Sequence, residues 1–235
     1  MRIFQFKSGY RYTSDTLFLW DFAAEILAKR YKGGKILDVG AGCGILGLLL
    51  ARDFKNFKIS LLEIQSENFQ ILRKNVTENE LDCEILINDF NEFLASQKFD
   101  FIVSNPPFYN AKNTKTTNEH KLISKFDLNL SLKDFIKNSS LNLKQNGELI
   151  FCYEAKVLSE IFETLKASKF SVLSLKFIHS KVGKESALAL IHAKKNSKSG
   201  LKILSPDFMY DGENYSKNTS AIFKKANLES VDYEL

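Results

Sequence analysis

Short apolar segments alternate with longer amphipathic segments along most of the chain, and this alternation restricts the fold more than any other feature. It is typical of a parallel sheet covered by helices. We expect strands at residues 35–39, 58–63, 84–87, 99–104, 148–153, 170–178 and 186–193. We expect helices at residues 17–27, 45–53, 66–78, 132–143, 156–168 and 216–227.

The connection between the last two expected strands sets the direction of the final strand. The segment SKVGKE leaves no room for a crossover helix, so the last strand should be antiparallel to the one before it. The sequence therefore predicts an α/β fold with a seven-stranded, doubly wound, Rossmann-like sheet and a reversed last strand.

The length of 235 residues suits one domain with extensions better than two complete domains, since domains typically have about 150 residues. We expect residues 35–194 to form the sheet domain, residues 1–34 to form an N-terminal cover, and residues 195–235 to be an extension of the same domain. The polar stretch 110–126 lies outside the alternation, and long stretches of this kind are usually functional lids.

Composition excludes several other classes of protein. No apolar run approaches the ~20 residues that a membrane span needs, and the N-terminus lacks the apolar core of a signal peptide, so we expect a cytoplasmic protein. The three cysteines form no CxxC pair and there are only three histidines, so we expect neither disulfides nor a metal site.

A glycine-rich loop follows the first expected strand in the segment KILDVGAGCG. Ligands of doubly wound sheets bind at the carboxyl ends of the strands, where glycines let a ligand approach the backbone. Gly40, Gly42 and Gly44 are spaced G-x-G-x-G, which departs from the G-x-G-x-x-G of nicotinamide binding. Glu63 ends the next strand and could accept bonds from two ribose hydroxyls. Asp89 follows the third strand, where it could meet the amine of an adenine.

These residues resemble the S-adenosylmethionine site of the class I methyltransferases, whose loop motif D/E-x-G-x-G-x-G is matched by residues 38–44, starting at Asp38. The resemblance implies that S-adenosyl-L-methionine is the cofactor. It also implies that the loop glycines pack against the methionine part, that Glu63 holds the ribose, that Asp89 contacts the adenine, and that Asp38 is one of the cofactor-binding residues.

The turn after the fourth expected strand contains Asn105, Pro106, Pro107, Phe108 and Tyr109. Two successive prolines stiffen the turn and leave carbonyl groups free to accept bonds. Bonds from an exocyclic amine to the Asn105 side-chain oxygen and the Pro106 carbonyl would free the nitrogen lone pair for attack on a methyl group. Phe108 could stack on a planar substrate group. A methyltransferase acting on a ring carbon would need a cysteine in this turn.

This turn resembles the (N/D/S)-P-P-(Y/F/W) motif of amino-methylating enzymes, which act on adenine N6, cytosine N4 or a glutamine amide. Together with GYRYTSDTLFLWDF at residues 9–22 and ENYS at residues 213–216, it resembles the bacterial tRNA (valine) adenine-N6 methyltransferase family. That resemblance implies that residues 12–15 close over the cofactor from the N-terminal side, with Tyr12, Thr13 and Asn105 among the residues that bind it. It also implies that Tyr109 contacts the substrate and that the partner is RNA. Either Ser14 or Asp15 could also be a helix N-cap.

Charge distribution bears on the substrate. The net charge is only +5, but residues 176–202 carry seven lysines and one acid, Glu185, a local excess of 7 − 1 = +6. Such a patch could attract phosphates, or it could be a solvated face that aids solubility. We expect Lys181 and Lys184 to meet phosphates of the RNA, and we expect a monomer. Release-factor glutamine methyltransferases typically carry a further N-terminal helical domain, for which the 34 residues before the first expected strand leave no room.

Three alternatives remain open at this point. The substrate amine could belong to a DNA adenine or to a protein glutamine amide, or the chain could be an RNA-binding module without turnover.

Overall fold

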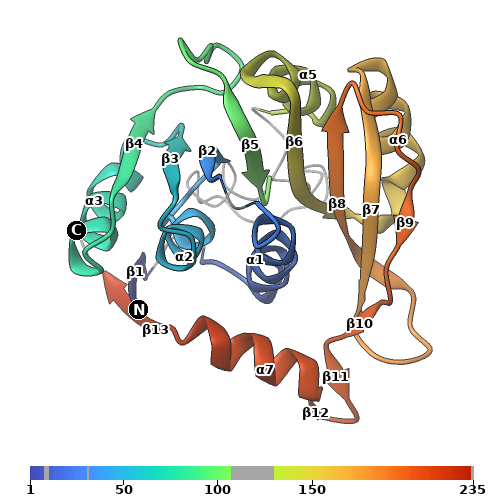
Figure 1. The fold of residues 1–235 in the computed structure, drawn as a ribbon. Helices are drawn as coiled ribbons and strands as arrows, with labels where there is room; N and C mark the ends of the chain where they lie inside the picture. Colours follow the sequence, from blue (N-terminus) through green and yellow to red (C-terminus); the bar gives the residue numbers. More distant parts are fainter. Residues whose placement is uncertain (8–10, 31, 107–129, 234–235) are drawn as a thin grey trace.

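The computed structural model describes residues 1–7, 11–30, 32–106 and 130–233. Seven long strands form its central sheet: β2 (Gly34–Val39), β3 (Phe57–Glu63), β4 (Cys83–Ile87), β5 (Phe99–Ser104), β6 (Leu143–Glu154), β7 (Phe170–His179) and β8 (Ser186–Lys195). Their order is β7-β8-β6-β5-β2-β3-β4 (Figure 1), and β8 is antiparallel to both of its neighbours. The predicted fold class and the reversed last strand are confirmed.

Helices cover both faces of this sheet (Figure 1). They are α1 (Ser14–Leu27), α2 (Ile45–Asp53), α3 (Asn68–Glu78), α5 (Leu132–Asn142), α6 (Leu158–Ala167) and α7 (Lys217–Ala226), with a short 3-10 turn, η2 (Ala155–Val157). Two hydrophobic cores result, one with α1, α2 and α7 and the other with α5 and α6. In β2, Ile36 enters the first core and Leu37 the second, as the alternation of side chains along a strand requires.

Several details differ from the sequence-based expectation. α1 begins at Ser14 and its N-cap is Thr13, so neither Ser14 nor Asp15 caps the helix. β6 begins at Leu143, directly after α5, because Leu143 pairs with Phe99 of β5; the register then shifts, and pairing resumes at Phe101 and Glu148. Two short strands of the tail, β9 (Lys202–Ile203) and β10 (Asp207–Phe208), pair with β7 and extend the sheet to nine strands.

Two further sheets were not expected from the sequence. β1 (Arg2–Phe6) pairs in parallel with β13 (Glu229–Tyr233), so the two ends of the chain lie together. β11 (Tyr210–Asp211) and β12 (Asn214–Tyr215) form a small hairpin before α7.

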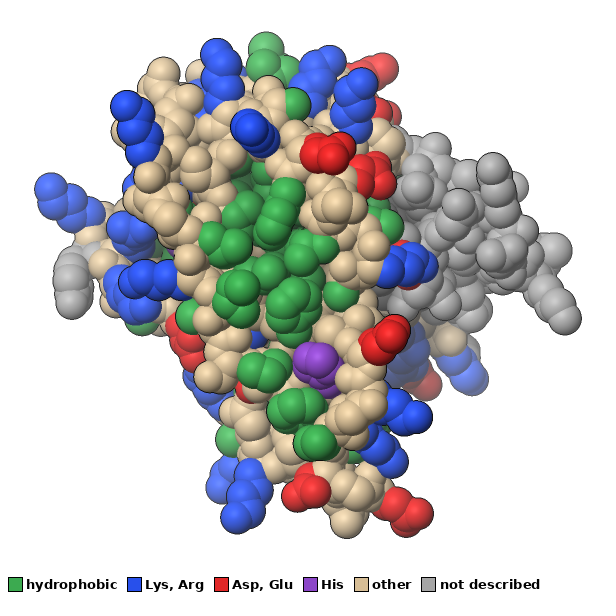
Figure 2. All heavy atoms as spheres, turned by 90° about the vertical axis from the view of Figure 1, so that its right-hand side faces the viewer, with side chains coloured by type: hydrophobic (Ala, Val, Ile, Leu, Met, Phe, Trp, Pro, Cys, Tyr) green, Lys and Arg blue, Asp and Glu red, His purple; other side chains and the backbone are tan. Residues whose placement is uncertain are grey.

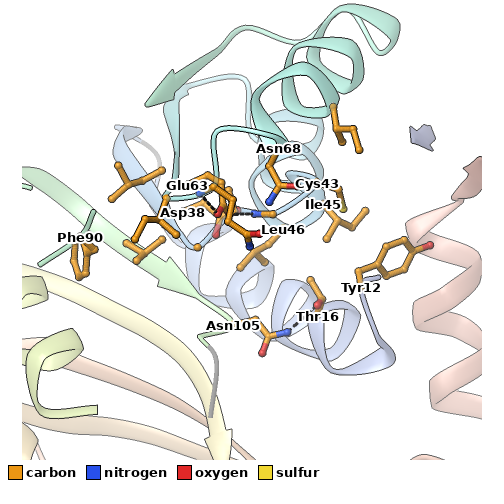
Figure 3. A pocket seen from close by; sticks show the side chains of 18 of the residues that line it. Tyr12, Thr16, Asp38, Cys43, Ile45, Leu46, Glu63, Asn68, Phe90 and Asn105 are labelled. Atoms are coloured by element: carbon orange, nitrogen blue, oxygen red, sulfur yellow. Dashed lines mark hydrogen bonds between the residues drawn. The ribbon is translucent and has the colours of Figure 1, made fainter. Parts of the chain in front are cut away.

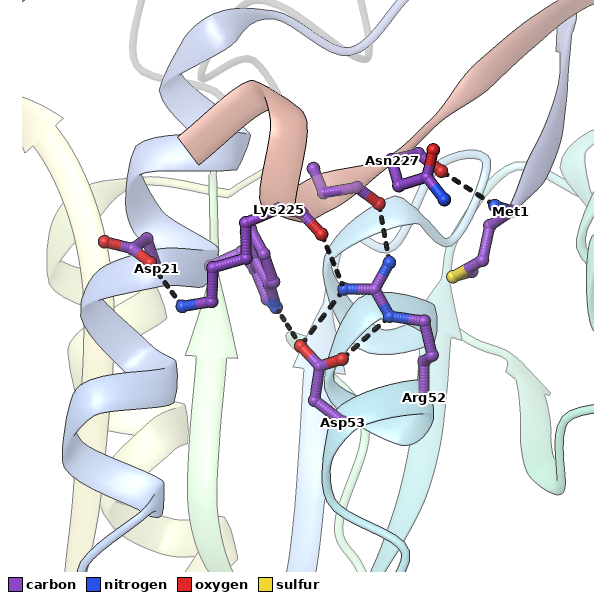
Figure 4. A network of polar contacts seen from close by, with 8 residues as sticks. Met1, Asp21, Arg52, Asp53, Lys225 and Asn227 are labelled. Carbon is purple, nitrogen blue, oxygen red and sulfur yellow. Dashed lines mark hydrogen bonds and ion pairs between the residues drawn. The ribbon is translucent and has the colours of Figure 1, made fainter. Parts of the chain in front are cut away.

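Polar contacts dock the C-terminal helix α7 onto α1 and α2 (Figure 4). The Arg52 guanidinium donates to the Ala226 carbonyl oxygen at 2.5 Å and pairs with Asp53, which also accepts from Trp20 Nε1 at 3.0 Å. Lys225 Nζ lies 2.6 Å from Asp21 Oδ1. Because Arg52 satisfies a carbonyl group at the C-terminal end of α7, it also interacts favourably with the helix dipole.

Two of the seven lysines between residues 176 and 202 pair with acids outside that segment. Lys176 is 2.7 Å from Asp207, and Lys194 is 3.1 Å from Glu148, which also pairs with Arg30. On the face with β7, β9 and α6, apolar side chains gather in the middle, and lysines and arginines lie around the margin (Figure 2). Among the described residues, no helix has the length and apolarity needed to cross a membrane.

Candidate functional site

A pocket lies at the C-terminal ends of β2, β3 and β5, where doubly wound sheets bind their ligands. Figure 3 shows its lining side chains, which come from the strand ends, the glycine loop and α1. Seven predicted cofactor residues line it: Tyr12, Asp38, Gly40, Gly42, Glu63, Asp89 and Asn105. Among the lining residues that the sequence did not single out are Phe6, Thr16, Asn68, Phe90 and Leu130.

The glycine loop presents its backbone to the pocket. Gly40 and Gly42 have φ angles of 70° and 57°, in the left-handed region that favours glycine. A Cβ atom on either residue would meet no other atom within 4 Å, so it would occupy open space at the pocket wall. Gly44 serves packing instead, because a Cβ there would lie 2.9 Å from Leu72 and 3.1 Å from Leu48. It does not line the pocket.

Glu63 joins the end of β3 to the glycine loop. Its Oε2 accepts a hydrogen bond from the Gly42 amide at 2.7 Å, and its Oε1 accepts one from the Gln65 amide at 2.8 Å. The side chain is only 4% exposed, and burial raises the pKa of this carboxyl although the bonds from Gln65, Gly42 and Asn68 lower it. A carboxylate has about four acceptor positions, and the hydroxyls of a ligand would have to share them with these amide donors.

Asp38 anchors the start of α2 to the end of β2. Its Oδ2 accepts a bond from the Gly47 amide at 2.9 Å, in the first turn of that helix. Burial raises the pKa of Asp38 to about 8. The bond fixes the path of the loop between Asp38 and α2, so this residue shapes the pocket as well as lining it.

The Asn105 side chain is held from both ends where it follows β5. Its Nδ2 donates to Thr16 Oγ1 at 2.9 Å, and its Oδ1 accepts from the Cys152 thiol at 3.0 Å (Figure 3 shows the Thr16 bond). Thr16 and Cys152 are 4% and 0% exposed. Burial raises the pKa of Cys152 well above its ordinary value, so the sulfur stays a protonated donor. Because an amide oxygen has two acceptor positions, Asn105 Oδ1 can still accept a bond from a substrate.

The far wall of the pocket follows β4. Asp89 Oδ1 accepts a bond from the Asn91 amide at 2.8 Å, which fixes the turn. Phe90 is 4% exposed and contributes an apolar surface beside it. An acceptor next to an apolar wall suits a planar ring that carries an amine.

Tyr12 and Phe6 form the N-terminal side of the pocket. The Tyr12 amide donates to Gln5 Oε1 at 2.9 Å, and burial raises the pKa of the Tyr12 phenol. Thr13, which was predicted to close over the cofactor, occupies the N-cap position of α1 without a side-chain capping bond and does not line the pocket.

The predicted substrate residues are placed elsewhere or lie outside the described residues. Pro106, which was predicted to be catalytic, is buried and its side chain is not among those that line the pocket, whereas Pro107, Phe108 and Tyr109 lie outside the described residues. Lys181 and Lys184 are exposed in the connection between β7 and β8 and take no part in the pocket.

No fixed positive charge in the described lining of the pocket opposes a cationic ligand. This described lining includes the carboxyl groups of Asp38, Glu63 and Asp89 and contains no lysine or arginine. Across the part of the chain that the structure describes, no three histidine, cysteine, aspartate or glutamate side chains are grouped to hold a metal ion.

Comparison with known proteins identifies a family for this chain. Residues 19–174 match the model of the methyltransferase small domain. The chain is 28% identical to a tRNA1(Val) (adenine(37)-N6)-methyltransferase of Flavobacterium psychrophilum over 81% of this chain and 84% of that protein. It is 28% identical to a release factor glutamine methyltransferase of the same organism over 69% of this chain and 61% of that protein.

Other relatives are longer proteins. Identity to a ribosomal RNA small subunit methyltransferase C of Haemophilus influenzae is 28%, but the match spans 61% of this chain and only 42% of that protein. Among solved structures, a predicted O-methyltransferase from Agrobacterium tumefaciens has a TM-score of 0.68 at 19% identity, covering 93% of this chain and all of its own. The T. thermophilus 16S rRNA N2 methyltransferase in complex with AdoMet and guanosine has a TM-score of 0.58 at 24% identity, covering 80% of this chain and 45% of its own. At such identities these structures support the class I methyltransferase fold alone.

Proposed function

Because the chain belongs to the methyltransferase small domain family, we propose that it transfers the methyl group of S-adenosylmethionine to the exocyclic N6 of an adenine in RNA. We propose tRNA, near the anticodon, as the substrate. The tRNA adenine-N6 relative supports this choice, since it matches the chain over most of the length of both proteins.

The methyl donor is S-adenosylmethionine, which supplies an electrophilic methyl group on a positively charged sulfur. The pocket fits such a group, because no lysine or arginine among its described lining repels a cation and its glycine loop leaves open space beside the backbone. In our proposal Gly40 and Gly42 border the methionine part, Glu63 accepts bonds from the ribose hydroxyls, and Asp89 accepts one from the adenine amine.

The geometry of Asn105 is the observation that carries the proposed reaction. Its amide is held by Thr16 on one side and Cys152 on the other, at the edge of the pocket. An exocyclic amine is a poor nucleophile because its lone pair is delocalised into the ring. Bonds from its hydrogens to Asn105 Oδ1 and the Pro106 carbonyl favour a pyramidal nitrogen, whose lone pair can then attack the methyl group in line. Thr16 acts through Asn105 and is a positioning residue.

We further propose that the RNA is held by Phe108 and Tyr109, stacked on or beside the target base, and by Lys181 and Lys184 on its phosphates. Residues 1–34 are proposed as a cover of the cofactor site, residues 35–194 as the catalytic domain and residues 195–235 as an extension of it.

The test compares total tRNA, ribosomal RNA, DNA and release factors from cells with and without this protein. Loss of N6-methyladenosine from tRNA alone supports the proposal. Loss of N2-methylguanosine from ribosomal RNA would contradict the proposed substrate and indicate ribosomal RNA instead. Loss of methylglutamine from a release factor would contradict it and indicate that protein instead. An unchanged set of modifications would contradict a catalytic role.

A further inference from the structure

The C-terminal strand β13 lies beside the strand that leads to the cofactor pocket. β13 pairs with β1 in parallel from Arg2 opposite Glu229 to Phe6 opposite Tyr233. The N-terminal ammonium group of Met1 donates to the Asn227 carbonyl oxygen at 2.8 Å, just before β13 (Figure 4). Because a two-stranded sheet is marginally stable by itself, β1 depends on β13 and on the helix beneath it.

The helix beneath β1 connects it to the glycine loop. Asn75, on α3, is 0% exposed, and its side chain bonds both the amide and the carbonyl of Phe4, at 2.8 and 3.0 Å. The same Asn75 Nδ2 lies 2.8 Å from the carbonyl oxygen of Cys43, inside the glycine loop. The position of β1 is therefore coupled to the loop that borders the pocket.

A chain of side-chain bonds runs from β13 to Tyr12. Ser230 Oγ accepts from Gln5 Nε2 at 2.8 Å and from Arg11 Nη2 at 2.7 Å. Arg11 also pairs with Asp232. Gln5, which is 1% exposed, uses the other end of its amide to accept the Tyr12 backbone N–H at 2.9 Å.

Aromatic contacts form a second connection between β13 and the N-terminal side of the pocket. The Tyr233 ring packs against Phe4 and Phe6, with ring centroids 6.5 and 6.1 Å away. Phe6, like Tyr12, lines the pocket. Both pocket residues on the N-terminal side are thus connected to β13, Tyr12 through Gln5 and Phe6 through Tyr233.

We propose that β13 positions the cover of the cofactor site, with Ser230 and Tyr233 as positioning residues for S-adenosylmethionine binding. The inference rests on the proposed place of the cofactor in this pocket. Removing the Ser230 hydroxyl leaves the buried Gln5 amide without its partner, and an unsatisfied buried group of this kind costs about 1–3 kcal/mol. If that cost acts on the ordering of Tyr12, cofactor affinity falls by about 5- to 140-fold.

The experiment measures the dissociation constant of S-adenosylmethionine by calorimetry for the full-length protein and for Ser230→Ala, Tyr233→Ala and Glu229→Ala. Glu229 is the matched control, because it lies on the same strand and contacts Arg2 at 3.3 Å on the outer side, away from Gln5. We expect at least a fivefold weaker affinity for the first two variants and no change for the control. Hydrogen exchange adds a second readout, because Ser230→Ala should speed exchange of the Tyr12 amide and Glu229→Ala should not.

A further variant, Glu63→Ala, separates failure of this inference from failure of the proposed site. If Glu63→Ala loses cofactor affinity but Ser230→Ala and Tyr233→Ala bind as tightly as the unmodified protein, the role of β13 is wrong and the site stands. If Glu63→Ala also binds normally, the pocket is not the cofactor site and both proposals fall.

Discussion

Alanine substitutions at two glycines with the same backbone conformation distinguish the loss of a cofactor contact from the loss of stability caused by backbone strain. Gly42 and Gly212 have φ angles of 57° and 61°, and a Cβ at either would meet no atom within 4 Å. Alanine in the left-handed region costs about 1–2 kcal/mol at each position. For a protein of this size that loss lowers the melting temperature by about 2–8 °C.

Only Gly42 borders the pocket, since Gly212 lies in the turn between β11 and β12. We therefore expect Gly42→Ala and Gly212→Ala to lower the melting temperature alike, measured without cofactor. Calorimetry should then show at least a tenfold weaker affinity for S-adenosylmethionine in Gly42→Ala alone, which corresponds to about 1.4 kcal/mol of lost contact. Equal affinities in the two variants would refute the placement of the cofactor against the glycine loop.

Three further predictions concern Thr16 and Asp38 in the pocket and the two lysines proposed to bind RNA. Thr16→Val should lower kcat about tenfold at unchanged cofactor affinity, because it removes one of the two hydrogen bonds that hold the Asn105 side chain, worth about 1 kcal/mol. Thr16→Ser keeps the hydroxyl and should restore kcat; equal rates for both variants would contradict this. The pKa of Asp38 is raised to about 8 in the folded protein, so the protonated carboxyl group favours folding. Its contribution to the free energy of unfolding is complete below about pH 4 and is lost as the pH rises to about 8. Denaturant titrations should show that stability falls over that range by up to about 1.4 kcal/mol per pH unit relative to Asp38→Asn, and parallel pH profiles would argue against the shift. Replacing Lys181 and Lys184 by glutamine should reduce the salt slope of tRNA binding by up to about 2, and an unchanged slope would mean that neither lysine meets a phosphate.

The glycine loop was predictable because its determinants are local. The strand, the turn and the helix follow one another between residues 35 and 53. The positions with positive φ angles in this turn are glycines, which the sequence shows directly. The spacing of the glycines does not reveal which of them faces the ligand. A Cβ at Gly44 would crowd Leu72 and Leu48, so the role of Gly44 depends on how α2 packs.

The contacts that hold the site together were missed because they join distant residues. Thr16 reaches Asn105 across 89 positions, and Gln5 reaches Ser230 across 225. The strands that bring Gln5 and Ser230 together have five residues each, too few for a periodic pattern to identify them. The ion pair of Lys194 with Glu148 is likewise invisible in the sequence, because 46 positions separate the two residues.

The central claim is tested most directly by methylating RNA with the purified protein. Transfer RNA from cells that lack the protein is incubated with isotopically labelled S-adenosylmethionine and digested to nucleosides, which are identified by mass spectrometry. The account predicts labelled N6-methyladenosine with the unmodified protein, and a rate lower by about 100-fold or more with Asn105→Ala. Label in another nucleoside, or an equal rate with Asn105→Ala, would contradict it.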